Sequence, residues 1–226
     1  MTAPFEMSRL KIERCTLLLK ELESVLRQYR VNPPFGHKLY MKDSEVIAET
    51  DIKSGPVTSG PIIGDIVHNL RAALDLMACE LVRLNQGNDN SVYFPISDAA
   101  STLDAAIKQK NFHRAGQDAI NLLKSFAPYR GGNIALRAIH DLDIHDKHKA
   151  IIPTVSHFAI SVVLQFKDGL IDLDRSIVTV DPDSIDIVFP KKSPFSGEKV
   201  IPTLEQLVQL VDGIVQAFSD LASLRT

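Results

Sequence analysis

Hydrophobic residues recur every three to four positions over most of the chain, and in two regions they recur at every second position instead. The first spacing is typical of amphipathic helices, which bury one stripe of side chains and expose the others. The stretches that show it are residues 7–30, 61–85, 102–109, 117–127, 133–148 and 204–224. The sequence therefore predicts five or six helices, three of which are long.

Local signals predict where the long helices begin. Ser8 has a side-chain oxygen that can cap the first helix, and Pro61 is tolerated in the first turn of the second. Thr203 and Gln206 have the spacing of a capping box at the start of the last helix. We expect the three long helices to begin at these residues.

The every-second-position spacing is typical of β-strands. Residues 37–40 and 45–52 predict a hairpin with its turn at 42–44. Four further stretches predict an antiparallel meander, namely residues 159–166, 171–173, 177–180 and 185–189. The expected fold class is α+β, mainly helical, with a helical bundle that carries a small antiparallel β-sheet.

A chain of 226 residues is expected to form a single domain, with the bundle core at about residues 6–150 and 203–224 and the meander at about 150–190. Hydrophobic residues make up 45% and charged residues 23%, which excludes an intrinsically disordered chain. The net charge of -3 creates no overall attraction to nucleic acid, so contact with RNA would need a local basic patch.

No signal peptide and no apolar run long enough to span a membrane is found in the sequence, so we expect a cytoplasmic protein without a membrane partner. Cys15 and Cys79 lie at internal positions of apolar-periodic helices. Two cysteines in a chain of this length do not make a disulfide framework. Both are expected to be reduced core residues.

Two short runs contain more polar residues than a packed helix needs. In the first, GDIVHNLRAALDLMACELVR, the side chains of His68, Arg71 and Asp75 fall on one stripe beside the apolar face. Arg71 and Asp75 are four residues apart and can form an ion pair. The stripe is therefore either a structural ion pair with His68 at its boundary or part of a site, while Asn69 points to a different arc.

The second run, IHDLDIHDKHK, contains Asp143, Asp146, Lys147 and His148 on one predicted helix. We expect this helix to face the stripe of the first run across the bundle. Three interpretations stay open for the cluster. It can be the solvated end of a helix, it can hold a divalent metal together with residues of the first run, or it can form a metal-free polar site.

At these residues the chain resembles a family of uncharacterised bacterial and phage-borne proteins, in which a GDxxHNLRSALDHL helix precedes an ELDNIDKHR helix. The motifs span about residues 36–155 and keep their order and spacing. The matching residues are Gly64-Asp65, His68-Asn69-Leu70-Arg71, Ala73-Leu74-Asp75, Phe94-Pro95-Ile96, Ala127-Pro128-Tyr129, Leu142-Asp143 and Asp146-Lys147-His148-Lys149.

The family pattern is similar to the Arg-x4-His signature of HEPN domains, which are helical bundles that often act as metal-independent RNases in toxin and antiphage systems. The resemblance implies that Arg71 stabilises a phosphate and that a histidine is the general base on the RNA 2′-hydroxyl. It also implies an RNA partner, a homodimer whose symmetry mate completes the site, and neither a cofactor nor a metal.

This chain departs from the signature because Leu76 occupies the position of the histidine, and a leucine exchanges no proton. Either the chain is a degenerate, non-catalytic member, or His68 or His148 supplies the base. The catalytic candidates are accordingly Arg71, His68 and His148. The binding candidates are Asn69, Asp75, Asp143, Asp146 and Lys147.

Two alternatives to an RNA-directed module are kept. A metal-dependent hydrolase would use His68, Asp75, His145 and His148 as ligands. A non-enzymatic binding or assembly module would use the polar stripe as an internal hydrogen-bond network, so that its loss lowers stability without changing any activity.

Overall fold

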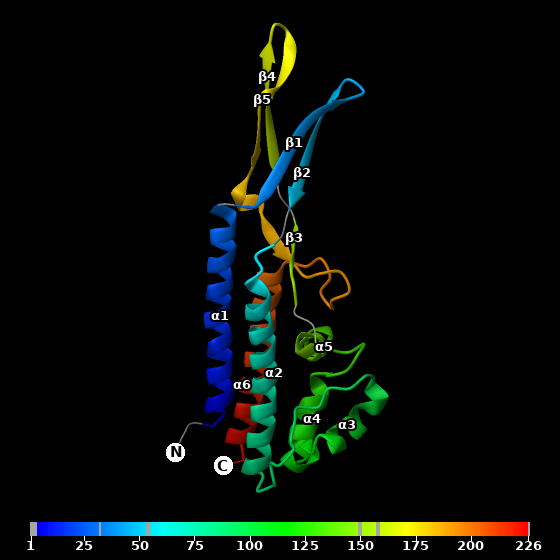
Figure 1. The fold of residues 1–226 in the computed structure, drawn as a ribbon. Coiled ribbons are helices and arrows are strands. Elements are labelled where there is room, and N and C mark those ends of the chain that lie inside the picture. Colours follow the sequence, from blue (N-terminus) through cyan, green and yellow to red (C-terminus); the bar gives the residue numbers. More distant parts are fainter. Residues whose placement is uncertain (1–3, 32, 53–54, 149–150, 157–158, 226) are drawn as a thin grey trace.

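The computed structural model describes residues 4–31, 33–52, 55–148, 151–156 and 159–225, with the backbone alone for residues 51, 52, 147 and 148. Three long helices lie side by side along the length of the molecule (Figure 1). They are α1 (Glu6–Val31), α2 (Ser59–Leu84) and α6 (Val200–Ser223). Helix α2 is the most central of the three, since its apolar residues are buried on almost every side.

The shorter helices follow α2 in the sequence, and those that precede α5 lie near its C-terminal half (Figure 1). They are the 3₁₀ helix η1 (Ala100–Thr102), α3 (Leu103–Gln109), η2 (Phe112–Ala115), α4 (Gln117–Ser125) and α5 (Ile134–His148). The ring of Phe112 packs edge-on against both Phe94 and Phe218, at centroid distances of 6.3 and 6.1 Å. These aromatic contacts join the short helices to the bundle core. Helix α5 packs directly against α2.

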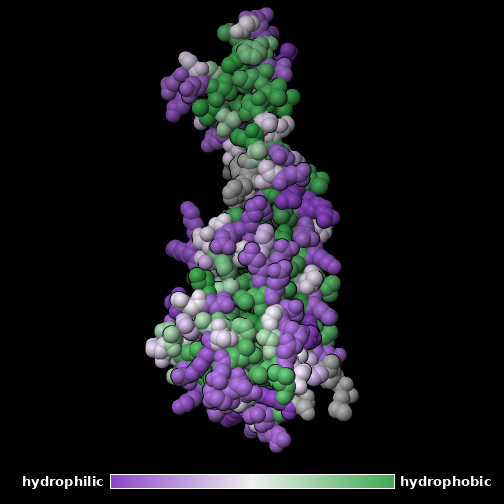
Figure 2. Space-filling model, turned by 180° about the vertical axis from the view of Figure 1, so that it is seen from behind, coloured by the Kyte–Doolittle hydropathy of each residue, from purple (hydrophilic) through white to green (hydrophobic). Residues whose placement is uncertain are grey.

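Two hairpins extend from one end of the bundle as an arm (Figure 1). Strand β1 (Phe35–Lys42) pairs with β2 (Glu45–Ile52), and β4 (Ile160–Lys167) pairs with β5 (Leu170–Val180). The first turn has positive φ at both Asp43 and Ser44, which suits the twist of a tight hairpin. Apolar side chains gather on the surface of this arm (Figure 2), and Phe166 and Leu170 are among the exposed ones.

The fold class is confirmed, because the chain is mainly helical and carries small antiparallel sheets. The predicted continuous meander is wrong. The stretches 171–173 and 177–180 are parts of the single strand β5, and the partner strand β4 absorbs the irregularity by a register shift between Val163 and Gln165. Strand β6 (Asp186–Val188) follows the 3₁₀ helix η3 (Pro182–Ser184) and pairs with β3 (Thr154–Ser156) rather than with β5.

Two predicted helix caps are also wrong. Ser8 lies buried inside α1, which begins after Phe5, a residue with positive φ whose backbone N–H donates to Glu80 Oε1 at 2.9 Å. Thr203 lies inside α6 and its hydroxyl donates to the carbonyl of Lys199 at 2.7 Å. Ser8 Oγ is buried without a hydrogen-bond partner among the described residues, whereas Thr203 bonds back to the preceding turn, so neither residue marks the first residue of its helix.

Cys15 and Cys79 are free thiols, as expected, and Cys15 is buried. Burial raises the pKa of Cys15 to about 12, which keeps this thiol protonated and unreactive. Among the described residues, no helix combines the length and the apolar character that crossing a bilayer requires.

Candidate functional site

Residues of both motif runs meet at a cavity of about 620 Å³ between α2, α5 and the segment that precedes Phe94. His68, Arg71 and Asp75 line it from α2, while His140 and Asp143 line it from α5. The prediction that the two motif helices face each other is therefore confirmed for His68, Arg71, Asp75 and Asp143. Leu76, at the position where the resemblance requires a histidine, also lines the cavity.

His68 and Asp143 form a dyad across the two helices. The imidazole Nδ1 of His68 lies 3.1 Å from Asp143 Oδ1. The two side chains differ in exposure, at 59% for His68 and 6% for Asp143. Because an ionised carboxylate only accepts hydrogen bonds, Asp143 favours the tautomer of His68 that carries its proton on Nδ1. The Nε2 lone pair then accepts a proton, and no described residue hydrogen bonds to Nε2.

Arg71 and Asp75 form a second polar group, which we call the clasp because both side chains hydrogen bond to the backbone of Phe94. Arg71 Nη2 donates to Asp75 Oδ1 and to the Phe94 carbonyl, both at 2.8 Å. Asp75 Oδ1 also accepts the Phe94 N–H at 2.8 Å. This network ties the extended segment that contains Phe94 to the middle of α2. The predicted ion pair four residues apart is therefore present, and it also has a structural role.

The Arg71 guanidinium is not fully satisfied by this clasp. Its side chain is only 10% exposed, and Nη1 is buried without a hydrogen-bond partner among the described residues. A buried donor without an acceptor costs about 1–3 kcal/mol. An acceptor oxygen that reached Nη1 would recover this cost, which makes Arg71 a candidate for binding an oxyanion.

Burial controls the protonation of two other groups at the cavity. It raises the pKa of Asp75, and the charge of Arg71 and the N–H of Phe94 offset only part of this effect. Burial also lowers the pKa of His140, and the positive charges of Arg71 and Arg137 lower it further. His140 is therefore a neutral imidazole near pH 7. It was not among the candidate residues, although it lies in the second motif run.

The rim of the cavity carries groups that periodicity could not find. Tyr93 is 47% exposed, and Lys110 Nζ lies 5.5 Å from the centroid of its ring. The Tyr93 backbone N–H donates to the Lys110 carbonyl at 3.1 Å, so the two residues are held together. Lys11 contributes from α1 and donates to Asn69 Oδ1 at 3.0 Å. Each belongs to a segment outside the two motif runs.

The formal charges of the side chains that line the cavity cancel. Lys11, Arg71 and Lys110 oppose Asp75, Asp89 and Asp143. Each of these carboxylates has a basic partner, because Asp89 pairs with Arg83 at 3.1 Å and the other two pair as described above. The two lysines contact a neutral amide and an aromatic ring instead. Their charges are therefore the least neutralised in the cavity.

The remaining binding candidates lie elsewhere. Asn69 does not line the cavity, and its side chain holds Lys11 and the carbonyl of Asp65. Asp146 packs against Gly64 of α2, so closely that a Cβ at position 64 would overlap its carboxylate. The Asp146 carboxylate also accepts the N–H of Ile151, and burial raises its pKa. Its placement indicates a structural role at the junction of α2 and α5.

The side chains of two candidates, Lys147 and His148, lie outside the part of the chain that the structure describes. Within the described part of the chain, no three His, Cys, Asp or Glu side chains gather closely enough to hold a metal ion. His68 and His145, two of the ligands in the metal hypothesis, line different cavities. The dyad, the clasp and the neutral His140 are the chemistry that the structure brings together.

A scan against protein-family models, a search of curated proteins and a search of solved structures each find no match to this chain. These comparisons neither support nor contradict the resemblance to HEPN domains, which stays a hypothesis.

Proposed function

We propose that this protein cleaves single-stranded RNA without a metal ion, at the cavity between α2 and α5. The observation that carries the proposal is the His68–Asp143 dyad, in which a buried carboxylate orients an exposed imidazole. The same division of roles makes histidine a general base in hydrolases that contain an orienting carboxylate. The nucleophile in RNA would be the 2′-hydroxyl.

In the proposed reaction, His68 Nε2 takes the proton of the 2′-hydroxyl while the 2′-oxygen bonds to the adjacent phosphorus. The bond from phosphorus to the 5′-oxygen breaks, the leaving oxygen takes a proton from water, and the hydroxide so formed removes the proton from His68 Nε2. The products are a 2′,3′-cyclic phosphate and a 5′-hydroxyl. Arg71 would donate Nη1 to a non-bridging phosphate oxygen, which would stabilise the charge that develops there.

Tyr93, Lys11 and Lys110 support a nucleotide ligand. A partly exposed tyrosine ring at the rim can stack on a nucleobase, and two lysines with neutral partners can each contact a phosphate. Because the lining charges cancel, binding should involve few phosphates. We expect a shallow dependence of log affinity on log salt, with a slope of about -1.4 for two single-strand contacts.

The test is cleavage of a single-stranded RNA by the purified full chain in the presence of EDTA. Wild type should release a 2′,3′-cyclic phosphate end and should not cleave DNA of the same sequence. His68→Ala should lower the rate by about 10²-fold or more, since a general base contributes about that much. His113→Ala is the matched control, because His113 is exposed and lies outside the cavity. Equal rates for the two variants, or no cleavage by wild type, would contradict the proposal.

A second candidate, a non-enzymatic module, is favoured by the clasp of Arg71 and Asp75 on Phe94. In that case the polar groups hold the fold together and the cavity binds RNA or another partner without cleaving it. It predicts that Arg71→Ala lowers the free energy of unfolding, while His68→Ala leaves both stability and binding unchanged. The loss of stability in Arg71→Ala is expected of both candidates, so cleavage by wild type and its loss in His68→Ala distinguish them.

The context of toxin or antiphage systems and the homodimer rest on the resemblance alone and are proposed with it. Growth arrest on expression of wild type, absent with His68→Ala, would support the first. A molar mass of two chains by light scattering would support the second.

A further inference from the structure

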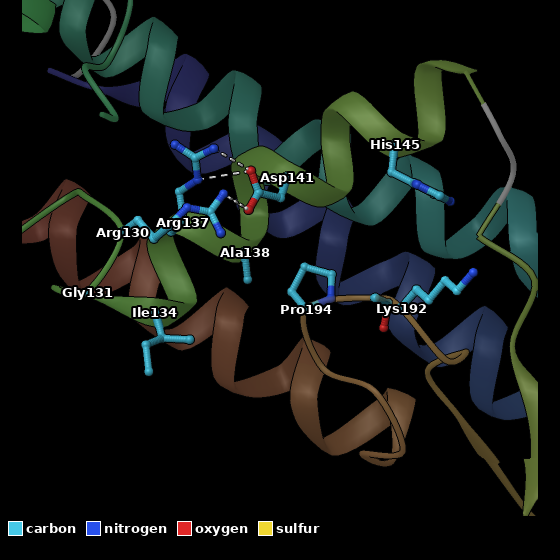
Figure 3. Close-up of a pocket in the computed structure, with 10 residues that line it drawn as sticks. Arg130, Gly131, Ile134, Arg137, Ala138, Asp141, His145, Lys192 and Pro194 are labelled. Carbon is cyan, nitrogen blue, oxygen red and sulfur yellow. Dashed lines mark hydrogen bonds and ion pairs between the residues drawn. The ribbon is translucent and has the colours of Figure 1, made fainter. Parts of the chain in front are cut away.

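A second cavity, of about 430 Å³, lies on a different face of α5 from the first, and its lining is drawn in Figure 3. The turn before α5 forms one wall through Arg130 and Gly131, and the loop between β6 and α6 contributes Lys192, Ser193 and Pro194 from the other side. Helix α5 separates this cavity from the proposed RNA site, because alternate faces of the helix line the two. Nothing in the proposed function uses its residues.

Arg137 is the most buried charged group here, and its contacts occupy it fully. Its Nε and Nη2 lie 2.9 and 2.8 Å from Asp141 Oδ1, as Figure 3 shows. Its Nη1 lies 2.9 Å from Asp98 Oδ1 and 3.2 Å from the Ser97 carbonyl. Arg137 and Asp141 therefore form an ion pair that lines the cavity, and the charges of these two residues neutralise each other.

Three other polar groups of the cavity lack strong partners. Arg130 reaches Asp141 only through a long contact of 3.5 Å, and its side chain is 64% exposed. Lys192 has no ion pair among the described residues, and Ser193 Oγ is buried without a hydrogen-bond partner there. With Arg137 included, three cations oppose the single carboxylate of Asp141 in the lining. Asp98, outside the lining, pairs with Arg137, so the excess amounts to about one positive charge.

The cavity is not uniformly polar. Ala138 and Pro194 line it between the end that holds Arg130 and Ile134 and the end that holds His145 and Lys192 (Figure 3). A concave site with an apolar middle and a few convergent polar groups is typical of small-molecule pockets. An inorganic ion would leave the apolar middle unfilled.

We infer that this cavity binds a small organic anion, in which a phosphate or carboxylate group meets Lys192 and Ser193 at one end and an apolar body extends over Pro194 and Ala138 toward Arg130. The anion supplies the acceptor that Ser193 Oγ lacks. The site is separate from RNA cleavage, so it holds whether or not the proposed function does.

The test is calorimetric titration of the full chain at fixed ionic strength with three probes: phenyl phosphate, inorganic phosphate and phenol. Phenyl phosphate should bind saturably at one site per chain, and more tightly than either probe that carries only the charge or only the ring. Arg130→Ala/Lys192→Ala should weaken its binding by about tenfold or more, because the charge-assisted hydrogen bond of Lys192 and the nearby positive charge of Arg130 are both lost. Ser193→Ala should weaken it by a smaller factor.

Lys191→Ala is the matched control, because Lys191 is an exposed neighbour that does not line the cavity. It should bind phenyl phosphate as wild type does, and all variants should keep the wild-type melting temperature to within a few degrees. Absence of saturable binding to wild type would overturn the inference. Equal affinities of the double variant and of Lys191→Ala would also overturn it, since the anion would then lie elsewhere.

Discussion

The two cavities on either side of α5 use arginine in different ways. On one side, Arg71 clasps Phe94 with one nitrogen and leaves another buried without a partner, next to an imidazole oriented by Asp143. On the other side, every nitrogen of Arg137 is engaged by Asp141, Asp98 or Ser97. The first arrangement leaves unsatisfied groups where a reaction can occur, whereas the second holds Arg137 in place with two carboxylates and a carbonyl beside a cavity in which a ligand can bind.

The largest expected difference between the cavities is the effect on RNA cleavage of substituting two aspartates, which lie on opposite sides of α5. Asp143→Asn should lower RNA cleavage by about 10²–10⁴-fold, because an amide can hold His68 in the wrong tautomer. Asp141→Asn should leave the rate unchanged, because Asp141 lines only the second cavity. Both rates are measured on the same RNA in EDTA. Equal losses would mean that α5 transmits structural damage and that the two sides are not separate.

The next largest effect should be on stability, from loss of the fully engaged arginine. Arg137→Ala should lower the free energy of unfolding by about 3 kcal/mol, because it leaves Asp141 without its main partner. Arg71→Ala should cost about 1–2 kcal/mol, since it removes the orphaned Nη1 along with the clasp. Urea unfolding of both variants checks the order. A larger loss for Arg71→Ala would contradict it.

A smaller effect should separate charge from hydrogen bonding at the clasp. Burial raises the pKa of Asp75, so the negative charge itself is poorly stabilised there. Asp75→Asn keeps an oxygen that can accept from Arg71 and Phe94 and should cost less than about 1 kcal/mol, whereas Asp75→Ala should cost about 1–3 kcal/mol. Matched urea titrations measure both. Equal costs would show that the ion pair matters more than the hydrogen bonds.

The smallest expected effect is a pH dependence from His140. Its folded pKa lies below the unfolded value of about 6.5, so at pH values between the two the unfolded chain binds more protons. The contribution of His140 to the free energy of unfolding should be fully present above about pH 6.5. It should fall as the pH decreases below this value, with a slope of at most about 1.4 kcal/mol per pH unit. His140→Gln should flatten the curve. An unchanged curve would mean that His140 is solvated.

The sequence predicted the features that depend on helical periodicity. The stripe of His68, Arg71 and Asp75 lines one cavity, and its expected pairing with the second motif helix is seen in the contact between His68 and Asp143. Asp146 is predicted as a binding residue, but its carboxylate packs against α2 because position 64 is a glycine. Periodicity determines the side of the helix on which a residue lies, but not whether the neighbouring element leaves a cavity there.

Several of the residues that could not be predicted come from segments without periodicity. Tyr93, Lys110 and Lys192 reach the two cavities through loops or helix ends, whose positions depend on tertiary packing. In the sequence, β3 precedes the β4–β5 hairpin and β6 follows it, so their pairing is likewise a long-range contact. Local patterns contain little information about such contacts, because they are set by which surfaces meet after the helices have packed.

The central claim is that Asp143 fixes the proton of His68 on Nδ1 and leaves Nε2 to accept one. Long-range ¹H–¹⁵N NMR of the wild-type protein, at a pH where His68 is neutral, reports the tautomer of this ring directly. The structure predicts the Nδ1–H tautomer in wild type, with a shift toward a mixture in Asp143→Ala. A wild-type His68 that carries its proton on Nε2 would contradict the account.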